Sequence, residues 1–242
     1  FVNGVAAMSR SGLSGPARLC TGIFSTADLR LGDRAEDILT AHLQASSNFR
    51  GIRSAFPADL NETFLTGFSL LEKYNLAYDN WSPDFTRLPR LADLANKNPG
   101  VTVIVNHLGG KIDPSADEEE LSAWREAIDS VAACSNTVMK LGGAQMRVGD
   151  WEPPYHMHKA DSPWDSDKFL STLLPRYQYA FEKFGPDRCM FESNFPVDKD
   201  CISYRTLWNL FKKMAAKLGL SESEKMSVFS GTAARAYRLD RP

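Results

Sequence analysis

The sequence predicts an α/β fold of the barrel type, in which parallel strands alternate with helices. Six strand-like segments are each followed by a helix-forming segment, and residues 101–107 are rich in β-branched side chains, as in a parallel strand buried on both faces. The glycine-rich phosphate loops of a nucleotide-binding open sheet do not occur. An incomplete (β/α) barrel is therefore favoured over a doubly wound sheet.

Composition is consistent with one globular domain spanning residues 1–242, without repeats or linkers. The chain has 242 residues, 43% of them hydrophobic, and its net charge of -2 arises from 28 basic and 30 acidic residues spread along it. No basic stripe suited to nucleic acid is present, and no apolar run approaches the roughly 20 residues that cross a membrane. Four widely spaced cysteines favour a reducing, cytoplasmic location. These features predict a small-molecule partner and leave the oligomeric state open.

The first half of the chain is predicted to form the following helices and strands. Residues 1–15 are Gly- and Ser-rich and are expected to form an irregular lead-in or a short helix. Asp33 with Glu36 predicts a capping box that opens a helix, on whose apolar face His42 would pack. Thr63 is expected to open the next helix. The strands are predicted at residues 19–28, 49–54, 76–81, 101–107, 137–141 and 188–193.

The second half of the chain is predicted to contain further helices and one long loop. Residues 121–131 carry a helical stripe, and residues 150–167 form a long Pro-rich loop with the aromatic content of a functional lid. A helix over residues 168–184 is expected to break or kink at Pro175 and to end at Gly185. A further amphipathic helix follows, and Ser221 with Glu224 caps another.

A polar side chain ends each predicted strand. Because the carboxyl ends of parallel strands meet at one end of a barrel, we expect these groups to share a centre. They are Asp28, Arg53, Asp79, His107, Lys140 and Asn194.

Each of these side chains has alternative roles. His107 is suited to act as a general base, oxyanion stabiliser or ligand, or simply to bond a neighbour. Lys140 would either bind a substrate carboxylate or form a salt bridge to Asp79, since buried ions are seldom without a partner. Arg53 is suited to carboxylates because its guanidinium binds them through two parallel hydrogen bonds.

The last strand leads into four further candidates. Glu192, Ser193, Asn194 and Asp198 lie at its carboxyl end. Ser193 and Asn194 either serve function or only form a turn, and Asp198 either acts as a base or caps the next helix.

Three segments resemble the amidohydrolase-related family, most closely its lactonase-like and dicarboxylate-lactone hydrolase branch. These are residues 103–110, 138–143 and 188–199, with residues 231–237 extending the resemblance into the final helix. The family fold is a (β/α)8 TIM barrel of the metal-dependent hydrolase type. The resemblance implies that the six strands correspond to strands three to eight, so that about six of eight β/α units are present and the chain is a fragment lacking the first two.

Two departures from the family pattern bear on the metal. The family carries a His-x-His pair on its first strand, whereas here the only such spelling is His156-Met157-His158 in the Pro-rich loop. The family also has Ser-Asp after the last strand, where this chain has Ser193-Asn194. An amide takes no proton near neutral pH and is a poor ligand for a divalent cation. These departures favour a reaction without a metal. If a divalent ion such as zinc binds, His107 would hold it.

The resemblance implies a hydrolase that cleaves an ester-like lactone bond of a small carboxylated or hydroxylated substrate with activated water. His107, Asn194 and Asp79 are the expected catalytic residues. The expected substrate-binding residues are Arg53, Lys140, His158 and Ser193. The alternatives are a metal-dependent decarboxylase or amide hydrolase of the same fold, or a catalytically degenerate binding protein.

Overall fold

A computed structural model describes residues 1–13, 15–111, 113, 115–144 and 163–239. In this part of the chain, one sheet of six parallel strands has the order β1-β2-β3-β4-β5-β6, which confirms the predicted alternation. The strands are β1 Ile23–Ser25, β2 Phe49–Ala55, β3 Ala77–Trp81, β4 Val103–Val105, β5 Thr137–Leu141 and β6 Cys189–Phe191. The two edge strands, β1 and β6, do not pair with each other, so the sheet is an open, incomplete barrel.

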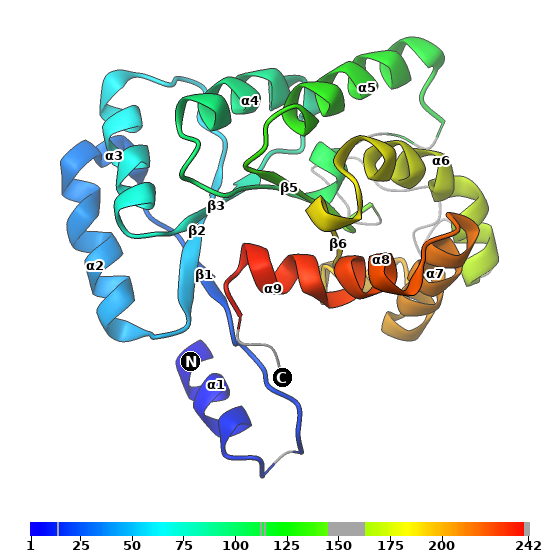
Figure 1. The fold of residues 1–242 in the computed structure, drawn as a ribbon, viewed down its shortest axis with the longest axis horizontal. Helices are drawn as coiled ribbons and strands as arrows, with labels where there is room; N and C mark the ends of the chain where they lie inside the picture. The colour runs from blue at the N-terminus through cyan, green and yellow to red at the C-terminus, as the bar shows by residue number, and fades with distance from the viewer. Residues whose placement is uncertain (14, 112, 114, 145–162, 240–242) are drawn as a thin grey trace.

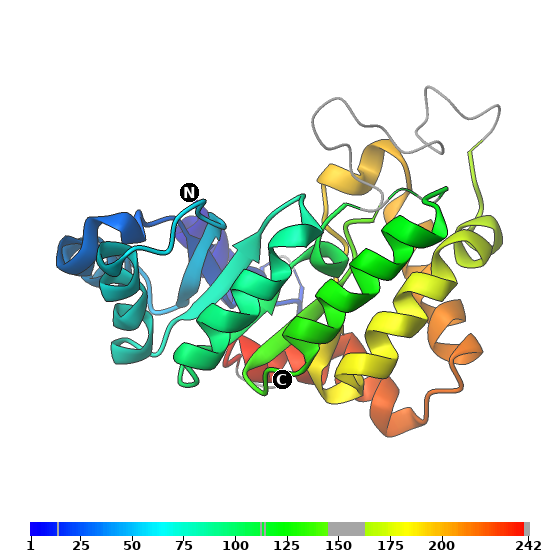
Figure 2. The same cartoon turned by 90° about the horizontal axis from the view of Figure 1, so that it is seen from above.

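Helices surround the curved sheet. They are α1 Val2–Arg10, α2 Ala35–Ala45, α3 Glu62–Lys73, α4 Leu88–Lys97, α5 Glu118–Ala132, α6 Ser166–Phe184, α7 Tyr204–Lys217, α8 Glu222–Met226 and α9 Thr232–Ala236. Figure 1 shows them arranged around the strands, and Figure 2 shows α4, α5 and α6 lying side by side. Among the described residues, no helix is both long and apolar enough to cross a membrane.

The period of two along each strand separates the two faces of the sheet. The outer face, with Ile52, Val105 and Met139, joins the large apolar core beneath the helices. On the inner face, Ala77, Ile104 and Met190 form a second, smaller cluster. Towards the carboxyl ends of the strands this inner face becomes polar, which places the candidate side chains inside the barrel.

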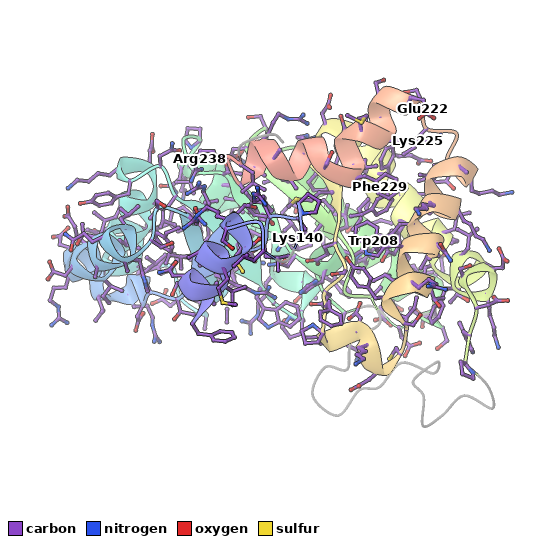
Figure 3. The ribbon with its side chains drawn as sticks, turned by 90° about the horizontal axis from the view of Figure 1, so that it is seen from below. Lys140, Trp208, Glu222, Lys225, Phe229 and Arg238 are labelled. Atoms are coloured by element: carbon purple, nitrogen blue, oxygen red, sulfur yellow. The ribbon has the colours of Figure 1, made fainter. Side chains whose placement is uncertain are left out.

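Helix α9 lies against the inner face. Its Ala233 and Tyr237, the residue just after it, pack on the small inner cluster, and the Tyr237 ring meets the Phe24 ring of β1 edge-on at 5.3 Å. The guanidinium of Arg238 donates to the Arg50 carbonyl at 3.2 Å, which ties the end of α9 to β2. Figure 3 shows Arg238 at this end of the helix. The final helix therefore bridges from β6 towards β1, across the side where the sheet is open.

Several predicted boundaries are corrected. The strand expected over residues 19–28 is only Ile23–Ser25, and the strand expected to run to residue 107 ends at Val105. For residues 1–15, the predicted alternative of a short helix is confirmed, because α1 occupies Val2–Arg10. Helix α6 continues through Pro175 rather than breaking there. It ends at Gly185, with φ +74°, as predicted.

The predicted capping signals had different outcomes. Asp33 does not cap a helix: Asp28 caps a short 3-10 turn at Leu29–Arg34, and α2 begins only at Ala35, so the predicted box with Glu36 is wrong. The capping box of Ser221 and Glu224 is confirmed at α8. Helix α3 begins at Glu62, one residue before the predicted Thr63, and Asn61 caps it through the Phe64 N–H.

Candidate active site

Five strands bring charged or polar side chains together on the inner face. Arg53 of β2 and Asp79 of β3 are register partners, so their side chains are neighbours. Lys140 lies near the end of β5, and Glu192 directly follows β6. Asn106 and His107 follow β4, where the chain turns into a short 3-10 segment with His107 at φ +50°.

Lys140 is held between two carboxylates. Its Nζ lies 2.7 Å from Asp79 Oδ2 and 3.8 Å from Glu192 Oε2. Burial of this ammonium lowers its pKa, but the charges of Glu192, Tyr237 and Asp79 outweigh that effect and raise the pKa above its usual value. Of the two predicted alternatives for Lys140, the salt bridge to Asp79 is the one present. Figure 3 shows Lys140 in the interior of the molecule, where its Nζ lies 5.8 Å from the centre of the Tyr237 ring.

Asp79 is fully engaged and almost completely buried, with 2% of the residue exposed. Besides Lys140, it accepts a hydrogen bond from the side-chain amide of Asn106, which also donates to the Asn80 carbonyl at 2.9 Å. The Arg53 Nε lies 3.8 Å from Asp79 Oδ1, the oxygen that accepts from Asn106.

His107 has a partner at each ring nitrogen. Its Nδ1 lies 2.5 Å from Glu192 Oε1, and its Nε2 lies 3.1 Å from Arg53 Nη2. The ring stands edge-on to Trp81, with 5.0 Å between ring centroids. Only 2% of His107 is exposed, whereas 41% of the Arg53 side chain is exposed. Arg53 is therefore the exposed partner of a buried imidazole.

Glu192 is the carboxylate that connects Lys140 with His107. Burial raises its pKa, but the charges of His107, Lys140 and Arg53 outweigh burial and lower the pKa to about 2. The group is thus ionised at neutral pH. Asp79, Lys140, Glu192, His107 and Arg53 form one continuous set of contacts, which we call the inner network.

Two glycines after β5 allow this close approach. A Cβ on Gly142 would collide with the Glu192 carbonyl, and a Cβ on Gly143, at φ +70°, would collide with His107 Nδ1. The Gly142-Gly143 turn is therefore explained by the space that the His107–Glu192 pair requires.

The other predicted site residues have different outcomes. Asp28 pairs with Arg30 in an exposed turn and takes no part in the inner network, so its predicted place in the ring is wrong. Ser193 accepts a hydrogen bond from the Phe195 N–H, and Asn194 donates to Asp198 at 2.7 Å, both within the turn after β6. His158 falls outside the described residues. Helix α7 is capped by Ser203, so Asp198 does not cap it.

Three participants have no role predicted from the sequence. The sequence makes Glu192 a candidate site residue but assigns it no function, and it does not make Asn106 or Tyr237 candidates. Asn106 follows Ile104 by two residues, so the strand period alone would have placed it on the inner face. For Tyr237 no local signal exists, because its place depends on α9 crossing the inner side of the sheet.

A cavity of about 610 Å³ lies at the ends of β1 and β2. It is lined among others by Asp28, Ser54, Phe56, Asp59 and Phe64, and by no member of the inner network. Charge, burial and mutual geometry, rather than this cavity, identify the candidate site.

The inner network is poorly suited to a divalent metal. No group of three or more His, Cys, Asp or Glu side chains among the described residues could hold an ion. One nitrogen of His107 faces a guanidinium, and an ammonium already lies between the two carboxylates.

The comparisons with known proteins agree with one another. The amidohydrolase family model matches residues 16–239. Protein y4mH of Sinorhizobium fredii, which is uncharacterised, is 34% identical over 232 residues, covering 90% of this chain and 70% of that protein. An L-fucono-1,5-lactonase of Burkholderia multivorans is 28% identical over 181 residues, covering 74% of this chain and 57% of the lactonase.

Solved structures show the same fold. An amidohydrolase from Burkholderia multivorans crystallised with HEPES has a TM-score of 0.73 and 25% identity, covering 90% of this chain and 74% of that one. A second crystal form, with bound zinc, has a TM-score of 0.74 and 22% identity, covering 98% and 80%.

Proposed function

Because the chain belongs to the amidohydrolase family, we propose that it is a hydrolase that opens the lactone ring of a small carboxylated or hydroxylated substrate. The observation that carries this proposal is the imidazole of His107, buried at the carboxyl ends of the strands with a guanidinium at one nitrogen and a carboxylate at the other. The lactonase relative supports the substrate class.

In the proposed reaction, Arg53 moves first. It is the exposed member of the inner network, and its guanidinium covers His107 Nε2. A substrate carbonyl or carboxylate oxygen draws this guanidinium away by offering a charge-assisted hydrogen bond, which uncovers Nε2.

Water then attacks the lactone carbonyl carbon, and His107 Nε2 accepts the proton of the attacking water. Arg53 stabilises the negative charge that develops on the carbonyl oxygen. As the bond from carbon to the ring oxygen breaks, the imidazolium returns its proton to that oxygen, and an open-chain hydroxy acid leaves. Lys140 and Asp79 hold the geometry, since each is occupied by the other.

The test is hydrolysis of a panel of five- and six-membered sugar lactones by the purified chain, followed by acid release. We expect turnover of at least one lactone, with His107→Ala lowering kcat by roughly 100-fold or more, as for a lost acid–base group. We also propose that turnover survives chelation.

His42→Ala is the matched control, because His42 lies on α2, where its ring packs beside Phe49 and its Nε2 contacts the Thr26 carbonyl. Its rate should equal that of the unmodified chain. Equal rates for His107→Ala and the unmodified chain would refute the proposed base, and loss of activity on chelation with restoration by zinc alone would refute the metal-free reaction.

A further inference from the structure

Glu192 has no role in the reaction steps above, although it makes the shortest contact to the proposed base. Its Oε1 lies 2.5 Å from His107 Nδ1, and its other oxygen faces the Lys140 ammonium at 3.8 Å. The side chain is 17% exposed, so it lies mostly away from solvent. Two cationic neighbours and a low pKa keep it charged at neutral pH.

The hydrogen-bond donors around His107 determine which nitrogen carries its proton. Arginine can only donate, so the contact of Arg53 Nη2 with Nε2 requires a lone pair on Nε2. A neutral imidazole with an unprotonated Nε2 carries its hydrogen on Nδ1, the nitrogen that lies 2.5 Å from Glu192 Oε1. The two contacts are mutually consistent only for this tautomer.

We propose that Glu192 is the positioning residue of the site: it accepts the Nδ1 hydrogen of His107, fixes the tautomer that leaves Nε2 free to take a proton, and balances the imidazolium that then forms. The function of Glu192 in turnover rests on the proposed hydrolysis, whereas the tautomer does not. Carboxylates that orient a working imidazole in this way are known to act through geometry and charge together.

The residues around the His107–Glu192 pair hold it in place. Lys140 holds the second oxygen of Glu192, Trp81 holds the ring edge-on, and Gly143 provides the space that brings β5 against Nδ1. These supports come from β3, from β5 and from the turn after β5, so the pairing is a product of the sheet and not of a local turn.

The tautomer is tested by ¹⁵N NMR of the chain labelled at histidine, at a pH where the imidazoles are neutral. The chain has four histidines, and the His107 signals are those lost in His107→Ala. We expect protonated Nδ1 and unprotonated Nε2 in the unmodified chain, and a measurable share of the opposite tautomer in Glu192→Leu. A dominant Nε2–H form in the unmodified chain would overturn the proposal, whether or not any lactone is hydrolysed.

Kinetics separate charge from hydrogen bonding. Glu192→Gln keeps an acceptor oxygen and removes the charge, and we expect kcat to fall by about 10- to 100-fold with little change in KM, as for other groups that orient a reactive side chain. Glu222→Gln is the control, because the Glu222 side chain on α8 is 90% exposed and its carboxylate pairs with Lys225 at 2.7 Å, far from the inner network (Figure 3). It should leave kcat unchanged.

If Glu192→Leu does not fold, the unmodified chain and Glu192→Gln still decide the matter. An unchanged kcat in Glu192→Gln, or a loss confined to KM, would contradict the positioning role.

Discussion

At the scale of single residues, the site depends on charges that compensate one another away from water. Lys140 and Asp79 are both buried, and removing either would take from the other its closest opposite charge, at a cost of roughly 3–5 kcal/mol. The sequence predicted this pair as one of two alternatives for Lys140, since buried ions rarely lack a partner. It did not predict the Glu192–His107 pair, because that contact joins the ends of β4 and β6, which are far apart in the chain.

The depressed pKa of Glu192 predicts an acid-dependent loss of stability. Its pKa falls from the usual 4.5 to about 2 in the folded protein. The unfolded chain therefore binds the proton first as the pH decreases, so the stability that Glu192 contributes is present above about pH 4.5 and is lost as the pH falls towards 2. Chemical denaturation across this range should show a steeper decline in the free energy of unfolding for the unmodified chain than for Glu192→Gln. Parallel curves for the two proteins would contradict the assignment.

At the scale of elements, short turns between strand and helix decide where the side chains point. The strand pattern located every strand, and the β5 boundaries were correct. The ends of β1 and β4 were placed too far along the chain, because Asp28 and Asn106 initiate tight turns that the apolar pattern does not reveal. Asn106 and His107 would lie on opposite faces of a continued strand, and the turn at His107 is what directs its side chain to the same side as Asn106.

The Gly142-Gly143 turn gives a test at this scale. Gly143→Ala places a methyl group against His107 Nδ1 at a positive φ, and we expect a loss of about 1–2 kcal/mol from the backbone conformation. Overpacking should add about 1–3 kcal/mol and lower kcat.

Gly185→Ala is the matched control, because Gly185 has nearly the same φ, +74°, and no atom lies within 4 Å of the place that an added methyl group would take. It should show the backbone cost alone, measured by urea unfolding. Equal losses in the two variants would mean that the contact with His107 does not limit this turn.

At the scale of the whole molecule, an open barrel leaves two strand edges and an inner face to be covered. The sequence predicted an incomplete barrel, and an incomplete barrel exposes strand edges and apolar surface that closure would bury. The structure adds that Tyr237 and α9 cover the inner cluster near Phe24 and Met190. This packing joins the two ends of the chain and could not be inferred from local patterns.

Tyr237 tests how much this packing contributes. Burial raises the pKa of its hydroxyl, and its ring packs on Phe24 at the inner cluster. Tyr237→Ala should lower the free energy of unfolding by about 2 kcal/mol or more, as for other large-to-small changes in packed sites. Tyr237→Phe keeps the ring and should retain most of that stability. Comparable losses in both variants would show that the hydroxyl, rather than the ring, makes the contribution.

The ring contact between Phe24 and Tyr237 also has a consequence for folding during translation. During synthesis, β1 leaves the ribosome long before α9, and at about 5–20 residues per second the interval is roughly ten to forty seconds. For that time the inner side of the nascent sheet has no cover from α9. Chaperone demand should therefore be highest late in translation and should fall when the final helix is released.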